Sequence, residues 1–85
     1  MPTISMFYGI LIRMYYDDHT PPHLHAIYGE EKASYDFNGE LLNGKLSTKQ
    51  HKLVVAWIEI HKEELQANWK LAQDGEQFFK IEPLK

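Results

Sequence analysis

The stretch that decides the fold reads Ile10-Leu11-Ile12-Arg13-Met14-Tyr15-Tyr16, then Asp17-Asp18-His19-Thr20-Pro21-Pro22, then His23-Leu24-His25-Ala26-Ile27-Tyr28. Its two flanks are rich in β-branched and aromatic residues, which favour strands. In the middle, acidic residues and a proline pair end a strand and stiffen the chain that follows. The pattern therefore predicts a strand at 10–16, a loop at 17–22 and a second strand at 23–28. Apolar residues occupy both faces of the first strand, with Arg13 as the polar exception, which predicts a central strand.

The sequence on either side extends this pattern into an antiparallel meander. Ile4 to Tyr8 forms a further extended segment, separated from the next one by Gly9. Lys32 to Phe37 and Glu40 to Leu42 flank Asn38-Gly39. That dipeptide is the strongest short hairpin signal, because a type I′ turn needs positive φ at both central residues.

The character of the sequence changes after Asn43-Gly44. Ser47-Thr48-Lys49-Gln50 matches a capping box, in which the serine and glutamine side chains cover free amides at a helix start. Apolar residues then recur at steps of three or four as far as Ala72, and the glycine of Asp74-Gly75 can end a helix. The predicted fold class is α+β: an antiparallel meander sheet of about four strands in the N-terminal half, covered by one long C-terminal amphipathic helix. Phe78 to Ile81 is a candidate for a short terminal strand.

Size and composition narrow the class of protein. The 85 residues are expected to form a single domain spanning 1–85, and 44% of them are hydrophobic, enough for a compact core. The absence of cysteine excludes disulfides and thiolate metal sites and fits a reducing compartment. The N-terminus lacks the basic and apolar regions of a signal peptide. The longest apolar run, Met6 to Ile12, is far shorter than the roughly 20 residues that span a bilayer. We therefore expect a soluble cytoplasmic protein with no membrane contact.

The charge of the chain disfavours nucleic acid as a partner. There are 9 basic and 12 acidic residues, a net charge of −3, so the molecule as a whole repels phosphate backbones. Binding to nucleic acid would need a local basic patch, for which only Lys49, Lys52, Lys62 and Lys70 are candidates.

Three of the five histidines, His19, His23 and His25, fall within seven positions. Alternate residues of a strand point the same way and lie roughly 6.6–6.8 Å apart, so His23 and His25 can lean toward one point. The prolines restrict the loop and can hold His19 nearby at small entropic cost. Asp17 or Asp18 can ligate a metal too, or orient a histidine. The sequence thus predicts a metal site at His19, His23, His25 and Asp18, whose ligands suit Zn, Fe or Mn without distinguishing them.

The same residues permit other interpretations. Imidazole titrates near neutral pH, so this face can instead bind an anion such as phosphate or act in general acid–base catalysis. In the catalytic interpretation His23 or His25 is the general base and Arg13 stabilises the phosphate. The plain alternative is that these are partly exposed polar residues at a strand entrance, where the prolines shape a turn. Among the functional interpretations, metal or anion binding is favoured over acid–base catalysis.

The other candidates carry weaker signals. Glu30 lies one turn beyond His25 and is a weaker metal ligand. His61 lies beside the apolar stripe of the predicted helix, where it is expected to be a boundary residue that could complete the site. His51 is given little weight, because a protonated ring in the first helical turn opposes the helix dipole. Trp57 is expected in the core, whereas Trp69 near the helix end could contribute to an interface patch.

Several segments resemble a known bacterial family: Met1-Pro2-Thr3-Ile4-Ser5, Phe7-Tyr8-Gly9-Ile10, Asp18-His19-Thr20-Pro21-Pro22-His23-Leu24-His25-Ala26 and Ile81-Glu82-Pro83-Leu84. The family is catalogued as domain of unknown function 4160. The resemblance covers nearly the whole chain, and the Pro-Pro-His-x-His-Ala core is its most specific part. It implies membership of a toxin–antitoxin-like pair and a small protein partner encoded nearby, and it implies nothing firm about chemistry.

Three hypotheses about function follow. The first is a cytosolic partner-binding component of such a pair, in which the histidine cluster binds a metal or an anion. The second is an enzyme, a small metal-dependent or histidine-based nuclease or phosphoesterase that acts as the toxin. The third is a structural adaptor without a chemical site.

Overall fold

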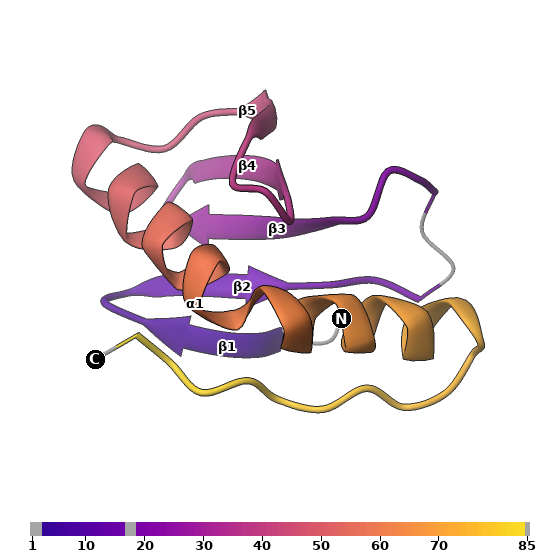
Figure 1. Ribbon diagram of the computed structural model, residues 1–85. Helices are drawn as coiled ribbons and strands as arrows, with labels where there is room; N and C mark the ends of the chain where they lie inside the picture. The colour runs from indigo at the N-terminus through magenta and orange to yellow at the C-terminus, as the bar shows by residue number, and fades with distance from the viewer. Residues whose placement is uncertain (1–2, 17–18, 85) are drawn as a thin grey trace.

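The computed structural model describes residues 3–16 and 19–84. Within these residues the elements are β1 Thr3–Phe7, β2 Ile10–Arg13, β3 His23–Tyr28, β4 Glu31–Asp36, β5 Leu41–Gly44 and α1 Thr48–Gln73. The strands form one sheet in the order β1-β2-β3-β4-β5, every neighbouring pair is antiparallel, and α1 covers one face (Figure 1). The predicted α+β meander with a covering helix is confirmed. The sheet has five strands rather than about four, because each extended segment found in the sequence pairs with the next.

Alternation along the strands sorts side chains onto two faces of the sheet. On the face covered by α1, Ile12 of β2 and Leu24 of β3 have no solvent exposure, and neither does Trp57 of α1. Burying side chains of this size stabilises the fold by about 1.5–3 kcal/mol each. The opposite face of the sheet is not covered by the helix (Figure 1). The sheet therefore has a core face and an open face, and β2 is an interior strand as predicted.

The helix begins where the sequence predicted, although the capping box does not form. Ser47 precedes α1 but makes no side-chain cap hydrogen bond. Its backbone N–H and its hydroxyl instead donate to the Glu31 carboxylate, at 2.9 and 2.7 Å. The hydrogen bonds from the Ser47 backbone and hydroxyl hold the pKa of Glu31 below its ordinary value of 4.5. A tertiary contact with β4 thus replaces the local cap.

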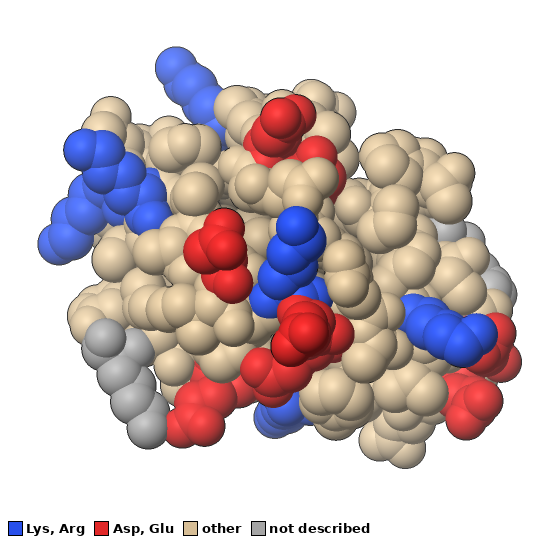
Figure 2. Space-filling view, in the orientation of Figure 1, with Lys and Arg blue, Asp and Glu red and all other residues tan. Residues whose placement is uncertain are grey.

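Inside α1 the backbone departs from helical geometry at His61, where φ is −110° and ψ is 21°. The half of α1 before this point crosses the sheet diagonally, and the half after it turns to run more nearly along β1 and β2 (Figure 1). Acidic and basic side chains are interleaved on the surface seen from the helix side, without a large patch of one sign (Figure 2). No helix among the described residues is long and apolar enough to cross a membrane.

The two turns that flank the inner strands differ from expectation. Tyr8 and Gly9 link the paired residues Phe7 and Ile10 and have positive φ angles of 50° and 79°. The two-residue turn with positive φ therefore joins β1 to β2. At the predicted type I′ turn, only the glycine of Asn38-Gly39 has positive φ. That turn is wider because the Asp36 carboxylate accepts the backbone N–H groups of residues 38 and 40, at 2.8 and 2.9 Å.

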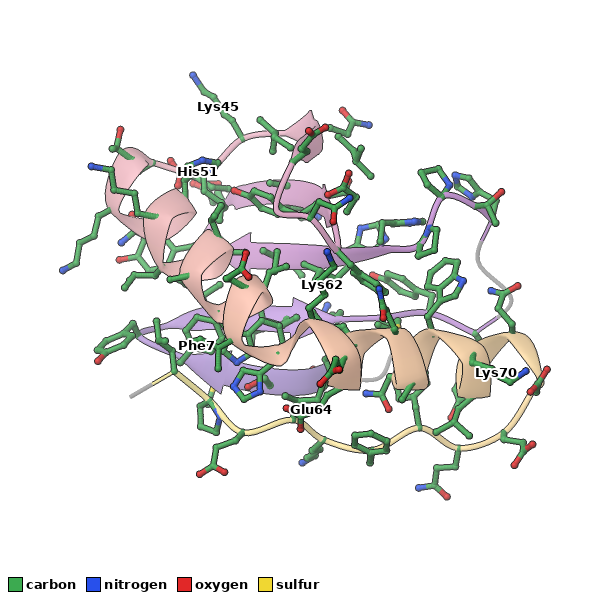
Figure 3. The ribbon with its side chains drawn as sticks, viewed as in Figure 1. Phe7, Lys45, His51, Lys62, Glu64 and Lys70 are labelled. Atoms are coloured by element: carbon green, nitrogen blue, oxygen red, sulfur yellow. The ribbon has the colours of Figure 1, made fainter. Side chains whose placement is uncertain are left out.

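A side-chain contact also fixes this wider turn to the helix. Lys62 of α1 donates to Asn38 Oδ1 at 2.6 Å, and its side chain is seen in Figure 3. Lys62 therefore has a hydrogen-bond partner within the fold. The Nζ of Lys70 lies 3.6 Å from Oδ2 of Asp74. Two of the four lysines considered for a basic patch thus have polar or acidic neighbours of their own.

The segment after α1 is extended but is not the predicted strand at 78–81. It runs back beside β1 (Figure 1), where the Ile81 N–H donates to the Ile4 carbonyl at 2.8 Å. Asn68 of α1 holds it from the other side: its amide nitrogen donates to the Phe79 carbonyl at 2.7 Å, and its amide oxygen accepts the Phe79 N–H at 3.1 Å. The side chain of Asn68 therefore takes backbone bonds that a strand ladder would have made.

Candidate functional site

A row of polar residues crosses the open face of the sheet. Arg13 of β2 pairs with His25 of β3, His25 pairs with Ser34 of β4, and Ser34 pairs with Asn43 of β5. Residues paired directly across neighbouring strands project from the same face and have Cβ atoms about 4.5–5.5 Å apart. The register of the sheet thus brings together four side chains from four strands.

This row lies in an open pocket of about 430 Å³. The polar lining comes from Arg13, His25, Lys32, Ser34 and Asn43, and the remaining lining from Tyr15, Ile27, Ala33 and Gly44. Gly44 has a φ of 70°, and a Cβ there would lie 2.1 Å from the Lys32 carbonyl oxygen, so only glycine lets β5 approach β4 this closely. A partly apolar pocket with a few converging polar groups is typical of small-ligand sites.

Arg13 is the only arginine of the sequence. Its Nε atom is buried and has no hydrogen-bond partner among the described residues. A buried donor without an acceptor costs about 1–3 kcal/mol, so such a group in a native protein calls for a physical explanation. An acceptor bound in the pocket would satisfy it.

The three clustered histidines lie side by side at the entrance of β3. The ring centroids of His19 and His23 are 5.4 Å apart, and those of His23 and His25 are 5.1 Å apart. The ring of His25 also contacts the ring of Tyr15 edge-on, with centroids 4.7 Å apart and an angle of 83° between the ring planes. His25 is therefore the member of the cluster that lines the pocket together with Arg13.

The middle histidine has a structural role in addition. His23 is only 6% exposed, and its ring lies 5.5 Å from that of Trp69 in the second half of α1. Its Nδ1 lies 2.7 Å from the Pro21 carbonyl oxygen. Because a carbonyl only accepts, Nδ1 carries a proton and donates it to this hydrogen bond. The proline bend and the helix together fix the orientation of this imidazole.

Residues 9–70 match the family described as "Domain of unknown function (DUF4160)". The chain belongs to this family. No curated protein and no solved structure matches it.

The part of the chain that matches DUF4160 contains every residue of the pocket and the whole histidine cluster. β1 and the extended segment after α1 lie outside the match. The family thus covers the polar row of the open face, and its description assigns no chemistry to that row.

Of the four predicted metal ligands, the structure describes the three histidines. His19, His23 and His25 are brought together, while Asp17 and Asp18 lie outside the described residues. Among residues 3–16 and 19–84, no group of three or more His, Asp or Glu side chains is arranged to hold a metal ion. The metal site that includes Asp18 therefore stays a prediction.

Other sequence candidates lie elsewhere or serve the fold. Glu30 follows the far end of β3, opposite the end that carries His23. His61 contacts Trp57, with ring centroids 5.3 Å apart, and its Nδ1 lies 2.5 Å from Glu64 Oε1. Both contacts are with residues of its own helix. Trp69 is 8% exposed, so the interface patch predicted for it is wrong.

His51 is more important to the fold than its weak signal implied. Its Nδ1 and the Tyr35 hydroxyl form a hydrogen bond of 2.8 Å. Tyr35 has no solvent exposure, and burial raises the pKa of its hydroxyl above the ordinary value of 10.0. This bond joins the first half of α1 to β4 and satisfies a buried polar group.

Sequence reasoning missed the contributions of β4 and β5 to the pocket. Lys32, Ser34 and Asn43 were not considered as site residues, because their approach to Arg13 depends on pairing across four strands. The one available signal was the alternation of β4, in which Lys32 and Ser34 fall on the face opposite Ala33 and Tyr35.

Proposed function

We propose that this protein binds a phosphate-type anion on the open face of its sheet, with Arg13 and His25 as the direct contacts. The observation that supports this most strongly is the buried Nε of Arg13, which has no partner among the described residues and lies directly across the strand pair from His25. Guanidinium presents a planar fork of donors that matches phosphate oxygens.

The remaining polar residues of the pocket fit the same ligand. Lys32 adds a second positive charge, and Ser34 and Asn43 add neutral donors. No Asp or Glu lines this pocket among the described residues, although the chain as a whole has a net charge of −3. An anion therefore meets a locally favourable site on an otherwise acidic protein.

The anion proposal is tested by titrating the protein with inorganic phosphate and following backbone amides by NMR. We expect saturable shifts at residues of β2, β3, β4 and β5. We also expect a loss of affinity of about ten- to a hundredfold in Arg13→Met, since a bond to a charged group contributes about 1.5–3 kcal/mol. Lys49→Met is the matched control: it removes one positive charge at an exposed position of α1 outside the pocket. Equal affinity in the two variants would refute the proposal.

We propose, in addition, that the protein acts as the partner-binding component of a toxin–antitoxin-like pair in the cytoplasm. The support is what the resemblance to the DUF4160 family implies, namely a small protein partner encoded nearby. Co-purification with the product of the neighbouring gene tests this, and a chain that elutes alone after co-expression would count against it.

A second candidate function is a small nuclease or phosphoesterase. It is favoured by the direct pairing of Arg13 with His25 and by the contact of His25 with the His23 ring. In this role His25 or His23 would remove a proton from the attacking hydroxyl or water, and Arg13 would stabilise charge on the phosphate oxygens. Cleavage of RNA, DNA or a phosphodiester that is lost in His25→Ala while the fold is kept would support it.

The metal form of the site is a separate proposal. It rests on the contacts of the His23 ring with those of His19 and His25, whose nitrogens suit Zn, Mn or Fe. It also needs Asp18 as a ligand, since the described histidines by themselves form no group arranged to hold a metal ion. Metal analysis of protein purified without a histidine tag tests it, and the absence of both bound metal and a thermal shift with Zn or Mn would argue against it.

A further inference from the structure

We infer that the anion is the phosphate of a nucleoside monophosphate, whose base packs against Tyr15 in the same pocket. This inference rests on the proposed anion site and names its ligand class. It follows from the size of the pocket, its lining beyond the charged groups and the charge of the rest of the molecule.

The pocket is too large for a bare phosphate. Its volume of about 430 Å³ lies within the roughly 300–1,000 Å³ range of small-ligand sites. Phosphate has five heavy atoms, and one water molecule accounts for about 30 Å³ of liquid, so the ion alone would leave most of the pocket to solvent. The ligand therefore carries a body attached to its anionic group.

The lining next to the charged groups suits a flat, partly apolar body. Tyr15 and Ile27 contribute aromatic and aliphatic surface to the same pocket. Tyr15 is held in position by the edge-on contact of its ring with His25, whose centroid is 4.7 Å away. A fixed aromatic ring beside a cationic group is the arrangement on which nucleobases stack, and such stacking contributes measurably for any base.

Hydrogen-bonding groups are available for the edge of a base. Asn43 Oδ1 accepts the backbone N–H of Gly44 at 2.8 Å, which orients the amide and leaves its NH₂ group as a donor. The Ser34 hydroxyl is its cross-strand neighbour and can donate or accept. Purines and pyrimidines both carry acceptors on their edges, whereas a simple alkyl phosphate would leave these groups unused.

The charge distribution favours a single nucleotide over a polymer. The chain has a net charge of −3, so a long polyanion meets overall repulsion from the protein. A long strand gains affinity from many phosphate contacts along a basic surface. Here the cationic groups that face a common ligand, Arg13 and Lys32, are those of one pocket.

The test compares four probes by NMR titration of the full chain: inorganic phosphate, adenosine 5′-monophosphate, uridine 5′-monophosphate and phenyl phosphate. Nucleotides are expected to bind at least about tenfold more tightly than inorganic phosphate, the gain from one stacked base. Tyr15→Leu is expected to remove this advantage, so that nucleotides and inorganic phosphate bind the variant with equal affinity. Tyr28→Leu, a change at an exposed tyrosine outside the pocket, is the control and should leave both affinities unchanged.

The outcomes separate this inference from the function on which it rests. Equal affinity for phosphate and nucleotides overturns the nucleotide assignment and leaves the anion site intact. Failure of every probe overturns both. Phenyl phosphate binding as tightly as the nucleotides would assign the pocket to aryl phosphates, and an oligonucleotide binding about a hundredfold more tightly than the monomer would assign it to a polymer; either result refutes the inference.

Discussion

Replacing Asn68 by alanine is expected to release the extended C-terminal segment from the helix. Asn68 has no solvent exposure and makes two hydrogen bonds to the backbone of Phe79, at 2.7 and 3.1 Å. Nearby, Phe78 and Ile81 are 9% and 3% exposed, so the same segment covers part of the core. The substitution removes a side chain that bonds to both the N–H and the C=O of residue 79.

The size of the effect follows from these contacts. Each hydrogen bond contributes about 1 kcal/mol net, and leaving its backbone partner unsatisfied costs about 1–3 kcal/mol. The segment can relax toward water, so the two costs do not add in full. We expect the free energy of unfolding to fall by about 2–4 kcal/mol, a large part of the roughly 5–15 kcal/mol typical of a domain.

Urea unfolding measures this loss, and hydrogen exchange locates it. The Phe79 amide should exchange faster in Asn68→Ala, while amides of β3 should still exchange only on global unfolding. Gln66→Ala is the matched control, because it removes an amide side chain from an exposed position of the same helix and should change stability by less than about 0.5 kcal/mol. A loss in Asn68→Ala below about 1 kcal/mol would refute the argument.

A second variant separates hydrogen bonding from lost volume. Asn68→Asp keeps the shape and still accepts the Phe79 N–H, but an ionised carboxylate cannot donate to the Phe79 carbonyl. Burial disfavours the charge, so the pKa of the new carboxyl should be raised in the folded state. The destabilisation relative to the natural protein should therefore be present above that pKa and shrink as the pH falls through it. A difference that stays constant with pH would contradict the assigned bonds.

Three further predictions concern the sheet. Gly44→Ala should destabilise by about 2–4 kcal/mol, from positive-φ strain and the 2.1 Å approach of its Cβ to the Lys32 oxygen, as measured by urea unfolding. The hydrogen bonds from Ser47 lower the pKa of Glu31, so the ionised Glu31 stabilises the fold above the ordinary carboxyl pKa of 4.5, and this stabilisation is lost as the pH falls below 4.5. Glu31→Gln has no carboxyl to protonate, so its unfolding midpoints measured across that pH range should fall less than those of the natural protein. Tyr8→Asn should stabilise by about 0.5–1 kcal/mol in thermal unfolding, since asparagine tolerates the φ of 50° better than tyrosine.

The fold class could be predicted because local patterns carry it. β3 was predicted at its observed bounds of His23–Tyr28. The helix was expected to start after Ser47 and to end near Asp74-Gly75, and α1 spans Thr48–Gln73. These features depend on neighbouring residues: alternation for the strand, steps of three or four for the helix, and glycine for its end. Where a distant side chain competed with a local motif, as Glu31 did for Ser47, the local prediction was wrong.

The histidine cluster depends on residues that are close in the sequence, whereas the pocket depends on residues that are far apart in it. The sequence by itself determined that His19, His23 and His25 lie close together, because a short proline-bent loop and one strand connect them. The pocket could not be found this way, since Arg13 and Asn43 line it together only through the register of four strands and lie thirty positions apart in the chain. Pairing register is set by the burial of a whole face against the helix, a property of the assembled sheet that no single segment contains.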